Sequence, residues 1–334
     1  MPTVLDSLNA ALHAAMATDP RVYLIGEDLL DPYGGAFKVA RGLSSAFPER
    51  VLSTPISEAG ITGLAAGMAL RGLRPVVEIM FGDFITLAAD QVVNHLAKFR
   101  WMYNNQVRLP LVIRTPMGGR RGYGPTHSQS LEKLFLGVPG LRVLAPSALL
   151  DPGGLLEKAI LESDRPVFFI ENKLLYLLPV QDQASLPEFE IHTAGPAGWA
   201  PAYTLALREA PPATLTLAAY GYMAELARQA ALRLAYEDEI FTELVVPTQL
   251  SPFEMEPILA SARRTGRLLA VEEGTLSLGW GAEILARTVE AMGPQLRSAR
   301  RLAGRDLPVP ASGPLEAFVL PGVAEILSSA RQMI

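Results

Sequence analysis

Short apolar runs alternate with helical segments through the first half of this chain. The runs are RVYLIGED (21–28), RPVVEIMF (74–81), LPLVIRTP (109–116) and RPVFFIENK (165–173). The segments between them have helical character, among them ITLAADQVVNHLAKFRWMYN (85–104) and PGGLLEKAILESD (152–164). Strands and helices in alternation predict a mostly parallel sheet covered by helices on both faces, which is the α/β class.

A second alternating series follows and predicts a second, smaller α/β domain. Its expected strands are TLTLAAYG (214–221), FTELVV (241–246) and RLLAVEEG (267–274), and helical patterns lie between and after them. From Leu178 to about Ala213, Pro, Gly and Ala dominate, so we expect a linker with a few short strands. Because 334 residues are too many for one ordinary core, we predict domains at 1–178 and 214–334, joined by a linker at 179–213.

Composition excludes several classes of function. The chain has no cysteine, so disulfide frameworks, thiolate metal sites and cysteine nucleophiles are excluded. A net charge of −5 argues against nucleic acid or an anionic membrane as the main partner. Arg71 and Arg74 interrupt the best candidate for a membrane span, and the first residues lack the pattern of a signal peptide. We therefore expect a soluble cytoplasmic protein.

One of the four histidines stands out by its context. His127 lies in GGRRGYGPTHSQS (118–130), a Gly-rich, basic loop that follows a predicted strand. Open α/β sheets place ligand groups in such loops, so His127 is a candidate site residue. His13 and His95 lie in helical patterns and His192 in the expected linker, where packing or solvation is the simpler interpretation. Phosphate-loop and dinucleotide motifs are absent from the sequence, and the histidine spacing does not favour zinc.

Glu58 is the second candidate, and it begins a helical segment rich in small residues. Gly60, Gly63 and Gly67 fall on one face of that segment, a pattern that lets another backbone approach closely in a core or an interface. As a plain structural residue, Glu58 would be an acid favoured by the helix dipole, with Ser57 as the cap. Its apolar surroundings make it hard to solvate, and a buried acid needs a partner.

These segments, with others, resemble the beta subunit of 2-oxo acid dehydrogenases, the thiamine diphosphate-dependent, decarboxylating component of the pyruvate, branched-chain and acetoin complexes. The first half carries GED (26–28), TPISEAGITGLAAGMALRGLRPVVEIMFGDF (54–84), DQVVNHLAK (90–98), RTPMGG (114–119), HSQSLE (127–132), PGLRVLAPS (139–147) and ENKLLY (171–176). The second half carries AAYG (218–221), RRTGRLLAVEEG (263–274), GWGAEI (279–284), GRDLPVP (304–310) and LEAFVLP (315–321). The resemblance covers nearly the whole chain, and it implies a transketolase-like pyrimidine-binding domain followed by a transketolase C-terminal-like domain.

The resemblance implies a role for each candidate residue. A beta-chain glutamate that matches Glu58 contacts N1′ of the cofactor's aminopyrimidine ring and shares a proton with it. Phe84 matches an aromatic contact of that ring, and Ile56 is implied as a further cofactor-binding residue. His127 matches the active-site histidine that assists the oxo acid or the incoming acyl acceptor. Glu27 matches an acid that, with Glu58, lines a buried route between two cofactor sites.

The resemblance also implies partners and ions. Gly82–Asp83 and Asn104–Asn105 superficially resemble the GDG…NN metal–diphosphate signature of thiamine enzymes, but Phe84 stands where a glycine is needed and the interval is short. In two-chain members that signature lies on an alpha subunit, which holds the diphosphate through Mg²⁺. An α2β2 heterotetramer and a beta chain inactive by itself are therefore implied. A structural potassium ion is implied at positions that match Leu111, Ala159, Ile160, Glu162 and Asp164.

One stretch departs from the family pattern and keeps the acyl acceptor open. The family reads close to DLRTLxPxD where this chain has LVVPTQLSPFE (244–254), without the arginine and both acids. The prediction is oxidative decarboxylation of a 2-oxo acid with acyl transfer to a lipoyl-bearing acyltransferase. The alternative is a biosynthetic relative that moves a two-carbon unit from a 2-oxo acid or ketose to a carrier protein or other acceptor. A third function, an idle scaffold subunit, is disfavoured because Glu58 and His127 are present. Substrate selectivity is expected to depend partly on the alpha subunit.

Overall fold

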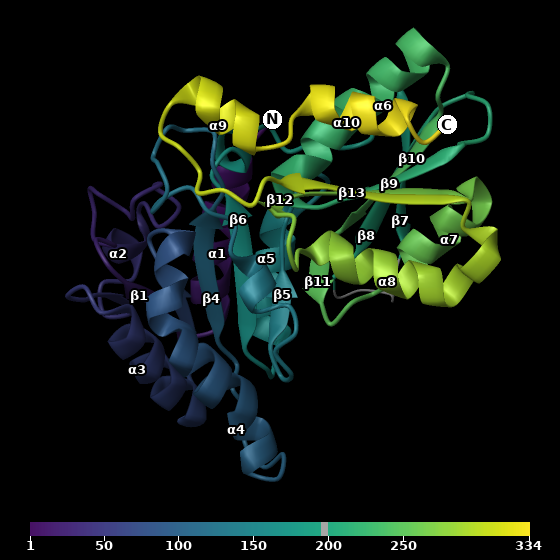
Figure 1. Ribbon diagram of the computed structural model, residues 1–334. Coiled ribbons are helices and arrows are strands. Elements are labelled where there is room, and N and C mark those ends of the chain that lie inside the picture. Colours follow the sequence, from purple (N-terminus) through teal and green to yellow (C-terminus); the bar gives the residue numbers. More distant parts are fainter. Residues whose placement is uncertain (195–199) are drawn as a thin grey trace. The chain divides into compact units, whose positions relative to one another are not determined.

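The computed structural model describes residues 1–194 and 200–334, which form two compact units (Figure 1). Unit 1 contains Met1–Met117, Leu134–Leu144 and Asp151–Val180, and unit 2 contains Gly118–Lys133, Ala145–Leu150 and Gln181–Ile334. Unit 2 therefore includes two short segments, 118–133 and 145–150, that interrupt unit 1 in the sequence. Within the described ranges, none of the helices combines the length and apolar character that a membrane crossing requires.

The described strands of unit 1 form a parallel sheet, as predicted. Neighbouring strands follow the order β5-β6-β4-β3-β1-β2, and every pair in that series is parallel. The register aligns Gly26 of β1 with Glu78 of β3, and Glu78 with Arg114 of β4, so the carboxyl ends of the central strands meet at one edge. In open α/β sheets that edge is where ligands bind. The strands are β1 (Val22–Gly26), β2 (Val51–Ser53), β3 (Arg74–Glu78), β4 (Val112–Met117), β5 (Arg142–Leu144) and β6 (Val167–Asn172).

Helices flank this sheet, and their ends follow ordinary capping rules. Thr3 and Asp6 form a capping box at the start of α1, and the Ser57 hydroxyl accepts the backbone N–H of Gly60 at the start of α3, at 3.3 Å. The predicted helical stretch 85–104 is a succession of three helix types, a 3₁₀ helix (η1), a π-helix (η2) and α4. The elements are α1 (Val4–Thr18), α2 (Leu43–Ala46), α3 (Glu58–Leu70), η1 (Gly82–Ala88), η2 (Gln91–Leu96), α4 (Ala97–Met102), α5 (Pro152–Glu162) and η4 (Leu175–Leu177).

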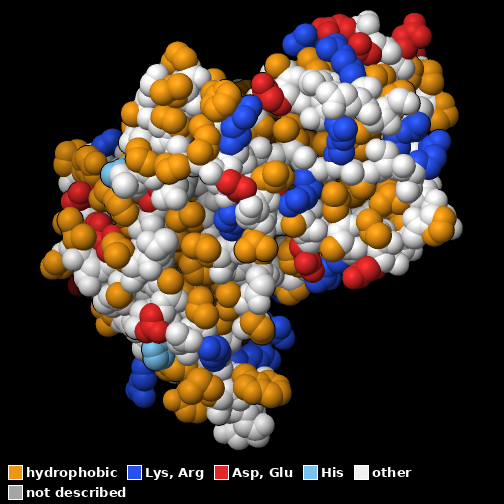
Figure 2. Space-filling model, viewed as in Figure 1, with side chains coloured by type: hydrophobic (Ala, Val, Ile, Leu, Met, Phe, Trp, Pro, Cys, Tyr) orange, Lys and Arg blue, Asp and Glu red, His pale blue; other side chains and the backbone are white. Residues whose placement is uncertain are grey.

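A tight turn follows the C-terminal end of α4, and apolar side chains lie at the surface there. Asn104 and Asn105 both have left-handed backbone angles, with φ of 51° and 59°, which agrees with their interpretation as a turn rather than a metal signature. Trp101 and Met102 are 82% and 60% exposed. Figure 2 shows hydrophobic side chains beside Lys and Arg at the surface over α4.

Unit 2 has a mixed sheet in the order β13-β12-β9-β10-β8-β7. The four strands β13, β12, β9 and β10 are parallel, whereas β8 and β7 run antiparallel at one edge. The strands of this sheet are β7 (Phe189–Ala194), β8 (Ala202–Leu207), β9 (Leu215–Ala219), β10 (Thr242–Pro247), β12 (Arg267–Thr275) and β13 (Ser298–Gly304). Unit 2 also contains the short strand β11 (Gln249–Ser251), which is not part of this sheet. The helical elements are η3 (Glu132–Leu134, which ends one residue into unit 1), α6 (Gly221–Asp238), α7 (Glu256–Thr265), α8 (Trp280–Met292), η5 (Gly293–Gln295), α9 (Gly313–Val319) and α10 (Val323–Arg331).

Alternate residues of β9 show why helices cover both faces of this second sheet. Leu215 and Leu217 are fully buried in an apolar cluster that includes α6 and α10. Thr216 points to the other face, where its hydroxyl lies 2.7 Å from that of Ser261 and 2.8 Å from that of Thr265, both on α7. In Figure 1, α6 and α10 lie on one side of the sheet and α7 and α8 on the other. The predicted α/β class, with two mostly parallel sheets flanked by helices, is confirmed.

The segment expected as a linker contributes to the second sheet. Within 179–213, residues 189–194 form β7 and residues 202–207 form β8. The antiparallel pairing of β7 with β8 and of β8 with β10 incorporates this Pro-rich segment into the sheet. Residues 195–199 of the expected linker lie outside the described residues.

Candidate functional site

Glu58 is the first residue of α3, and its side chain is buried although its neighbours are exposed. The residue is 6% exposed, whereas Ile56, two positions earlier, is 80% exposed. The Ser57 hydroxyl caps the helix, so the helix start does not require the Glu58 carboxylate as its cap. A carboxyl group at this position lies in the favourable field of the helix N-terminus. Glu58 is therefore a buried acid beside an open surface.

Glu27 lies close enough to Glu58 in unit 1 to be influenced by its charge, which agrees with the proximity that the resemblance implies. It follows the last residue of β1, at the carboxyl edge of the sheet, and is 7% exposed. Burial and the nearby charge of Glu58 raise the pKa of Glu27, while the backbone N–H of Ser57 lowers it. Its Oε1 atom is buried and has no hydrogen-bond partner among the described residues. A buried acid with an unused acceptor is suited to bind or pass a proton.

Phe84 lies in η1 of the same unit and belongs to a row of aromatic rings. Its ring centroid lies 5.8 Å from that of Phe81, and Phe81 lies 5.4 Å from Phe37. Phe84 itself is half-buried. The row gives unit 1 an aromatic surface of the kind that a flat heterocycle contacts.

A buried ion cluster at the same sheet edge escaped the sequence reasoning. Arg114 donates to Glu78 and makes two bonds with Glu171, at 2.8 Å from Nε and 2.5 Å from Nη2. Tyr176 donates to the second Glu171 oxygen at 2.6 Å. Burial raises the pKa of Glu78 in spite of Arg114, and burial together with Glu171 raises that of Tyr176. Burial alone would lower the pKa of Arg114, but the two carboxylates raise it. The only sequence signal was a set of charged residues within apolar strand runs.

His127 belongs to unit 2, in the loop that leads to Lys133. The residue is half-buried, its backbone N–H donates to the carbonyl of Gly124 at 3.3 Å, and its Nδ1 lies 2.9 Å from the Thr126 hydroxyl. The Thr126 hydroxyl thus fixes one ring nitrogen of His127 within the loop. The other histidines contact ordinary groups: His13 a backbone carbonyl, and His95 and His192 nearby acids.

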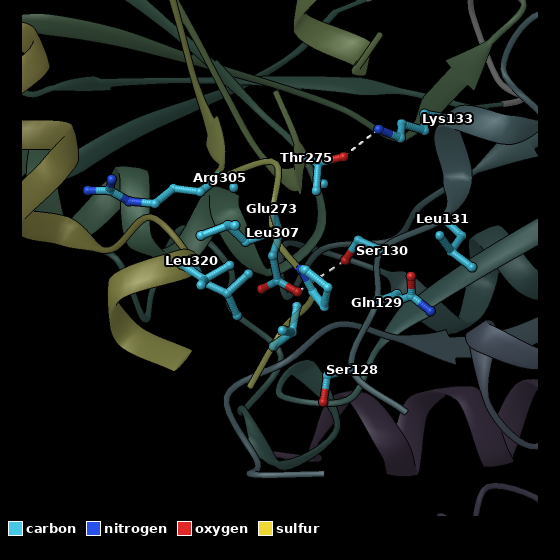
Figure 3. A pocket seen from close by; sticks show the side chains of 15 residues that line it. Ser128, Gln129, Ser130, Leu131, Lys133, Glu273, Thr275, Arg305, Leu307 and Leu320 are labelled. Carbon is cyan, nitrogen blue, oxygen red and sulfur yellow. Dashed lines mark hydrogen bonds between the residues drawn. The ribbon is translucent and has the colours of Figure 1, made fainter. Parts of the chain in front are cut away.

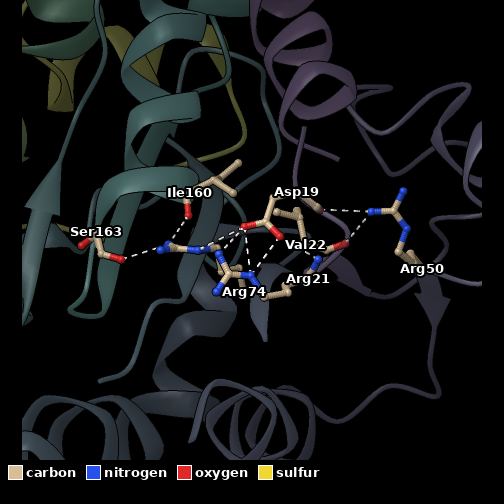
Figure 4. Close-up of polar contacts among 7 residues, drawn as sticks. All are labelled: Asp19, Arg21, Val22, Arg50, Arg74, Ile160 and Ser163. Carbon is tan, nitrogen blue, oxygen red and sulfur yellow. Dashed lines mark hydrogen bonds and ion pairs between the residues drawn. The ribbon is translucent and has the colours of Figure 1, made fainter. Parts of the chain in front are cut away.

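Three of the five residues matched to a potassium site, Leu111, Ile160 and Asp164, have backbone carbonyls that already accept hydrogen bonds, and all five lie in unit 1. Arg74 donates to the carbonyls of Ile160 and Ser163 at 2.8 and 3.1 Å (Figure 4). The carbonyls of Asp164 and Leu111 accept backbone N–H groups at 3.1 and 2.9 Å. Burial and the neighbouring Arg21 lower the pKa of Arg74, against the attraction of Asp19. Among the described residues there is no cluster of histidine and acidic side chains that could hold a metal ion.

Comparisons with known proteins agree along the whole chain. The family model "Transketolase, pyrimidine binding domain" matches residues 1–178, and "Transketolase, C-terminal domain" matches residues 205–326. The chain is 38% identical to pyruvate dehydrogenase E1 component subunit beta-1, mitochondrial, of Arabidopsis thaliana, over 99% of this chain and 88% of that protein. It is 35% identical to the acetoin:2,6-dichlorophenolindophenol oxidoreductase subunit beta of Cupriavidus necator, over 98% of this chain and 95% of that protein.

A solved structure shares the fold. The protein titled "Split gene transketolase, inactive beta4 tetramer" superposes with a TM-score of 0.74 over 99% of this chain and 98% of that chain. The sequence identity of 20% means that this likeness concerns the fold alone.

Proposed function

This chain belongs to the transketolase-like family that includes the beta subunits of pyruvate and acetoin dehydrogenases, and we propose that it is the beta subunit of a thiamine diphosphate-dependent 2-oxo acid dehydrogenase. In this role it acts with an alpha subunit to decarboxylate a 2-oxo acid and to transfer the acyl unit to a lipoyl domain. The observation that carries the proposal is the buried acid Glu58 at the start of α3, next to the exposed Ile56.

The residues of unit 1 fit a bound aminopyrimidine. Glu58 is a buried carboxyl group, and Glu27 has a buried oxygen without a partner in the described part of the chain, so the pair has unused capacity to bind and transfer a proton. Thiamine diphosphate, when bound, supplies the electron sink for the loss of carbon dioxide. In our proposal Glu58 binds the ring at N1′ and holds the proton there. Phe84 and Ile56 are further contacts of the ring.

Two further side chains have separate roles. Glu27, whose pKa is raised by burial and by Glu58, carries a proton to and from Glu58 along a buried route. His127, whose Nδ1 lies 2.9 Å from the Thr126 hydroxyl, assists the oxo acid or the acyl acceptor. The diphosphate and its Mg²⁺ are held by the alpha subunit. Each potassium-site carbonyl that accepts a hydrogen bond keeps a second lone pair, so ligation of K⁺ is compatible with the contacts of Arg74.

Replacement of the Glu58 carboxyl group tests the function directly. In the complex reconstituted with its alpha subunit, we expect Glu58→Ala to lower the rate of decarboxylation by about 10²- to 10⁴-fold, the usual contribution of a general acid–base group, and to leave assembly intact. Glu256, the exposed first residue of α7, is the matched control, because Glu256→Ala removes an acid from the same helix position in unit 2. Near-normal turnover of Glu58→Ala would contradict the assigned role.

The exposed face of α3 is evidence that this helix binds a partner chain. The sequence predicts that its small residues lie in a core or an interface, and within this chain Gly60 and Gly67 are exposed beside Leu64, which is 55% exposed. A side chain added at Gly67 would meet no atom within 4 Å. We therefore assign this face to the alpha subunit, since exposed apolar helix faces of this kind mark association sites.

The variant Gly67→Leu tests whether this face binds the alpha subunit without disturbing the fold of the chain. Because the site is open and Leu favours helix more than Gly does, the variant chain should unfold at the same or a higher temperature. Its co-purification with the alpha subunit should fall strongly, as measured by native mass. Gly137→Leu is the control, because its added side chain also meets no atom within 4 Å but lies away from α3. Normal assembly of Gly67→Leu would remove this face from the interface.

The acyl acceptor is tested by a panel of donors and acceptors. Acylation of a lipoyl domain from a 2-oxo acid is the expected outcome. Loading of a carrier protein instead would favour the biosynthetic alternative, in which a two-carbon unit is moved from a 2-oxo acid or a ketose. The expected cytoplasmic location and the identity of the oxo acid stay predictions.

A further inference from the structure

The loop that carries His127 has a backbone that needs external support. Gly118, Arg120, Gly122 and Gly124 all have left-handed angles, with φ of 95°, 68°, 68° and 80°. Arg120 is the unfavourable member of this set, because a residue with a β-carbon seldom adopts that conformation without compensation. Such turns point successive backbone N–H groups to one side, which creates a pocket for an anion.

Glu316 of α9 supplies that anion from far along the chain. Its Oε1 accepts the N–H of Arg120 at 2.6 Å, and its Oε2 accepts the N–H of Gly122 at 3.3 Å. Glu316 is 5% exposed, so its carboxylate is largely shielded from water, which strengthens hydrogen bonds to a charged group. The carboxylate thereby compensates the strained turn.

Glu273 of β12 joins the two limbs of the loop. Its Oε1 accepts the N–H of Gly119 at 2.9 Å on one limb and the hydroxyl of Ser130 at 3.1 Å on the other. Its Oε2 lies 3.5 Å from Nε of Arg120, and Nη2 of the same arginine donates to the carbonyl of Pro321 at 2.5 Å. His127 lies in the sequence between the two limbs that Glu273 connects.

Packing around the second limb is incomplete, because a cavity of about 190 Å³ lies against it. Ser128, Ser130 and Lys133 line the cavity from the loop side, and Glu273 and Leu320 line it from the other side (Figure 3). The Ser128 hydroxyl is buried and has no partner among the described residues. A limb next to a cavity has lost the contacts that a packed core would supply, so its position depends on hydrogen bonds.

We propose that Glu316 and Glu273 are positioning residues that fix the His127 loop, and with it the imidazole, in the conformation used for the reaction. The inference rests on the proposed function for the role of His127. Neither carboxylate touches the reacting atoms in this scheme. Their contribution is to hold two limbs of one loop from positions about 150 to 200 residues away in the sequence.

A first experiment measures the loop without using activity. Arg120 and Arg121 are trypsin sites inside the loop, and cleavage there requires local opening. In the full chain, Glu316→Gln should be cleaved at these sites about tenfold faster than the parent, because Gln replaces one acceptor oxygen by a donor. Glu325→Gln is the control, because this exposed acid accepts the N–H of Gly322 at the start of α10 instead of bonding to the loop. Equal cleavage rates for Glu316→Gln and the parent would overturn the proposal.

A second experiment asks whether the carboxylates act through His127. In the assembled complex, Glu316→Gln and Ser130→Ala should each lower kcat by about 3- to 30-fold, with KM for the oxo acid nearly unchanged. In a His127→Ala background the same changes should have almost no further effect, whereas a merely structural role would give additive losses. Ser130→Ala removes only the hydroxyl that reaches Glu273, so it keeps the test available if Glu316→Gln fails to fold.

The outcomes separate this inference from the proposed function. Additive losses in the double variants would overturn the positioning role, and so would a His127→Ala enzyme with normal turnover. The proposed function is judged separately by Glu58→Ala. If Glu58→Ala were fully active, the function would fail while the trypsin experiment would still decide whether Glu316 holds the loop.

Discussion

The two units bury carboxylates by different means. In unit 1, Glu78 and Glu171 share the guanidinium of Arg114, so one positive charge lies beside both carboxyl groups. In unit 2, Glu272 and Glu316 are held by backbone N–H groups. A cluster built on one cation fails when that cation is removed, whereas a carboxylate held by backbone dipoles keeps its donors through side-chain changes.

Against both patterns, Glu27 is the exception that points to function. It is as buried as these acids, but one of its oxygens has no partner among the described residues, and the nearby charge is the like charge of Glu58. Glu171 and Glu316 accept hydrogen bonds on both oxygens inside their own unit, whereas Glu27, with one unused oxygen, lies beside the proposed cofactor site. The difference between the two groups can be tested by changes that remove each kind of support.

The largest loss in the free energy of unfolding should come from removal of the Arg114 guanidinium in unit 1. Arg114→Met leaves two buried carboxylates without compensation, so we expect a loss of about 3–5 kcal/mol in the free energy of unfolding. Urea unfolding of the parent and the variant measures it. A triple variant that also carries Glu78→Gln and Glu171→Gln should recover part of the loss. A loss below about 1 kcal/mol in Arg114→Met would show that the cluster is not an ion-pair network.

The second effect is a pH dependence in unit 2. Burial raises the pKa of Glu272 to about 7, with Glu132 adding to the rise, although two backbone N–H groups at the start of α8 oppose it. Between about pH 4.5 and pH 7 the unfolded chain loses this proton and the folded chain keeps it. Stability should therefore fall as pH rises through this window, by about 3 kcal/mol from this group.

Urea unfolding at several pH values measures that slope. Glu272→Gln has no proton to lose, so the part of the slope that belongs to this residue should disappear in the variant. A slope that is the same in both proteins would assign the pH dependence to other groups.

A smaller effect is expected from a single neutral donor in unit 2. Tyr220 donates its hydroxyl to Glu132 at 2.5 Å, and both side chains are buried. Tyr220→Phe should lower the free energy of unfolding by about 1–3 kcal/mol, because the buried Glu132 loses the hydrogen bond that the Tyr220 hydroxyl donates to it. Thermal unfolding measures the loss, and it should be smaller than that of Arg114→Met. The reverse order would contradict the contrast between the two units.

The smallest effect belongs to an exposed pair. Arg263 lies 2.9 Å from Glu256 on α7, and both side chains are about half or more exposed. Arg263→Ala should change the free energy of unfolding by less than about 1 kcal/mol, since water already solvates both charges. The same unfolding measurement thus supplies the baseline for the buried positions.

Local sequence features predicted much of unit 1. The four apolar runs became β1, β3, β4 and β6, because buried parallel strands need apolar residues on both faces. The place of Glu58 at a helix start, with Ser57 as the cap, was also predicted and is confirmed. That Glu27 and Glu58 lie near each other followed from the family resemblance and agrees with the influence of one charge on the other.

The loop of His127 shows what local patterns could not provide. Within unit 2 it is bonded to Glu273 and Glu316, whose positions in the sequence are 154 and 196 residues from their partners Gly119 and Arg120. Neither glutamate differs in local sequence from a surface acid. The ion cluster of Arg114 was missed for the same reason, because its members come from three separate strands. Long-range pairing of charges is invisible to helical or strand periodicity.

Two tryptophans of known environment give this protein an optical reporter in each unit. Trp101 of α4 is 82% exposed, whereas Trp280 of α8 is 1% exposed, with its ring 5.1 Å from that of Tyr220. The emission of an indole depends on the polarity around it, so the two fluoresce at different wavelengths in the native chain. The sequence has a third tryptophan, Trp199. A double variant with Phe at Trp199 and at either Trp101 or Trp280 keeps a single indole, whose emission follows the unfolding of the unit that contains it.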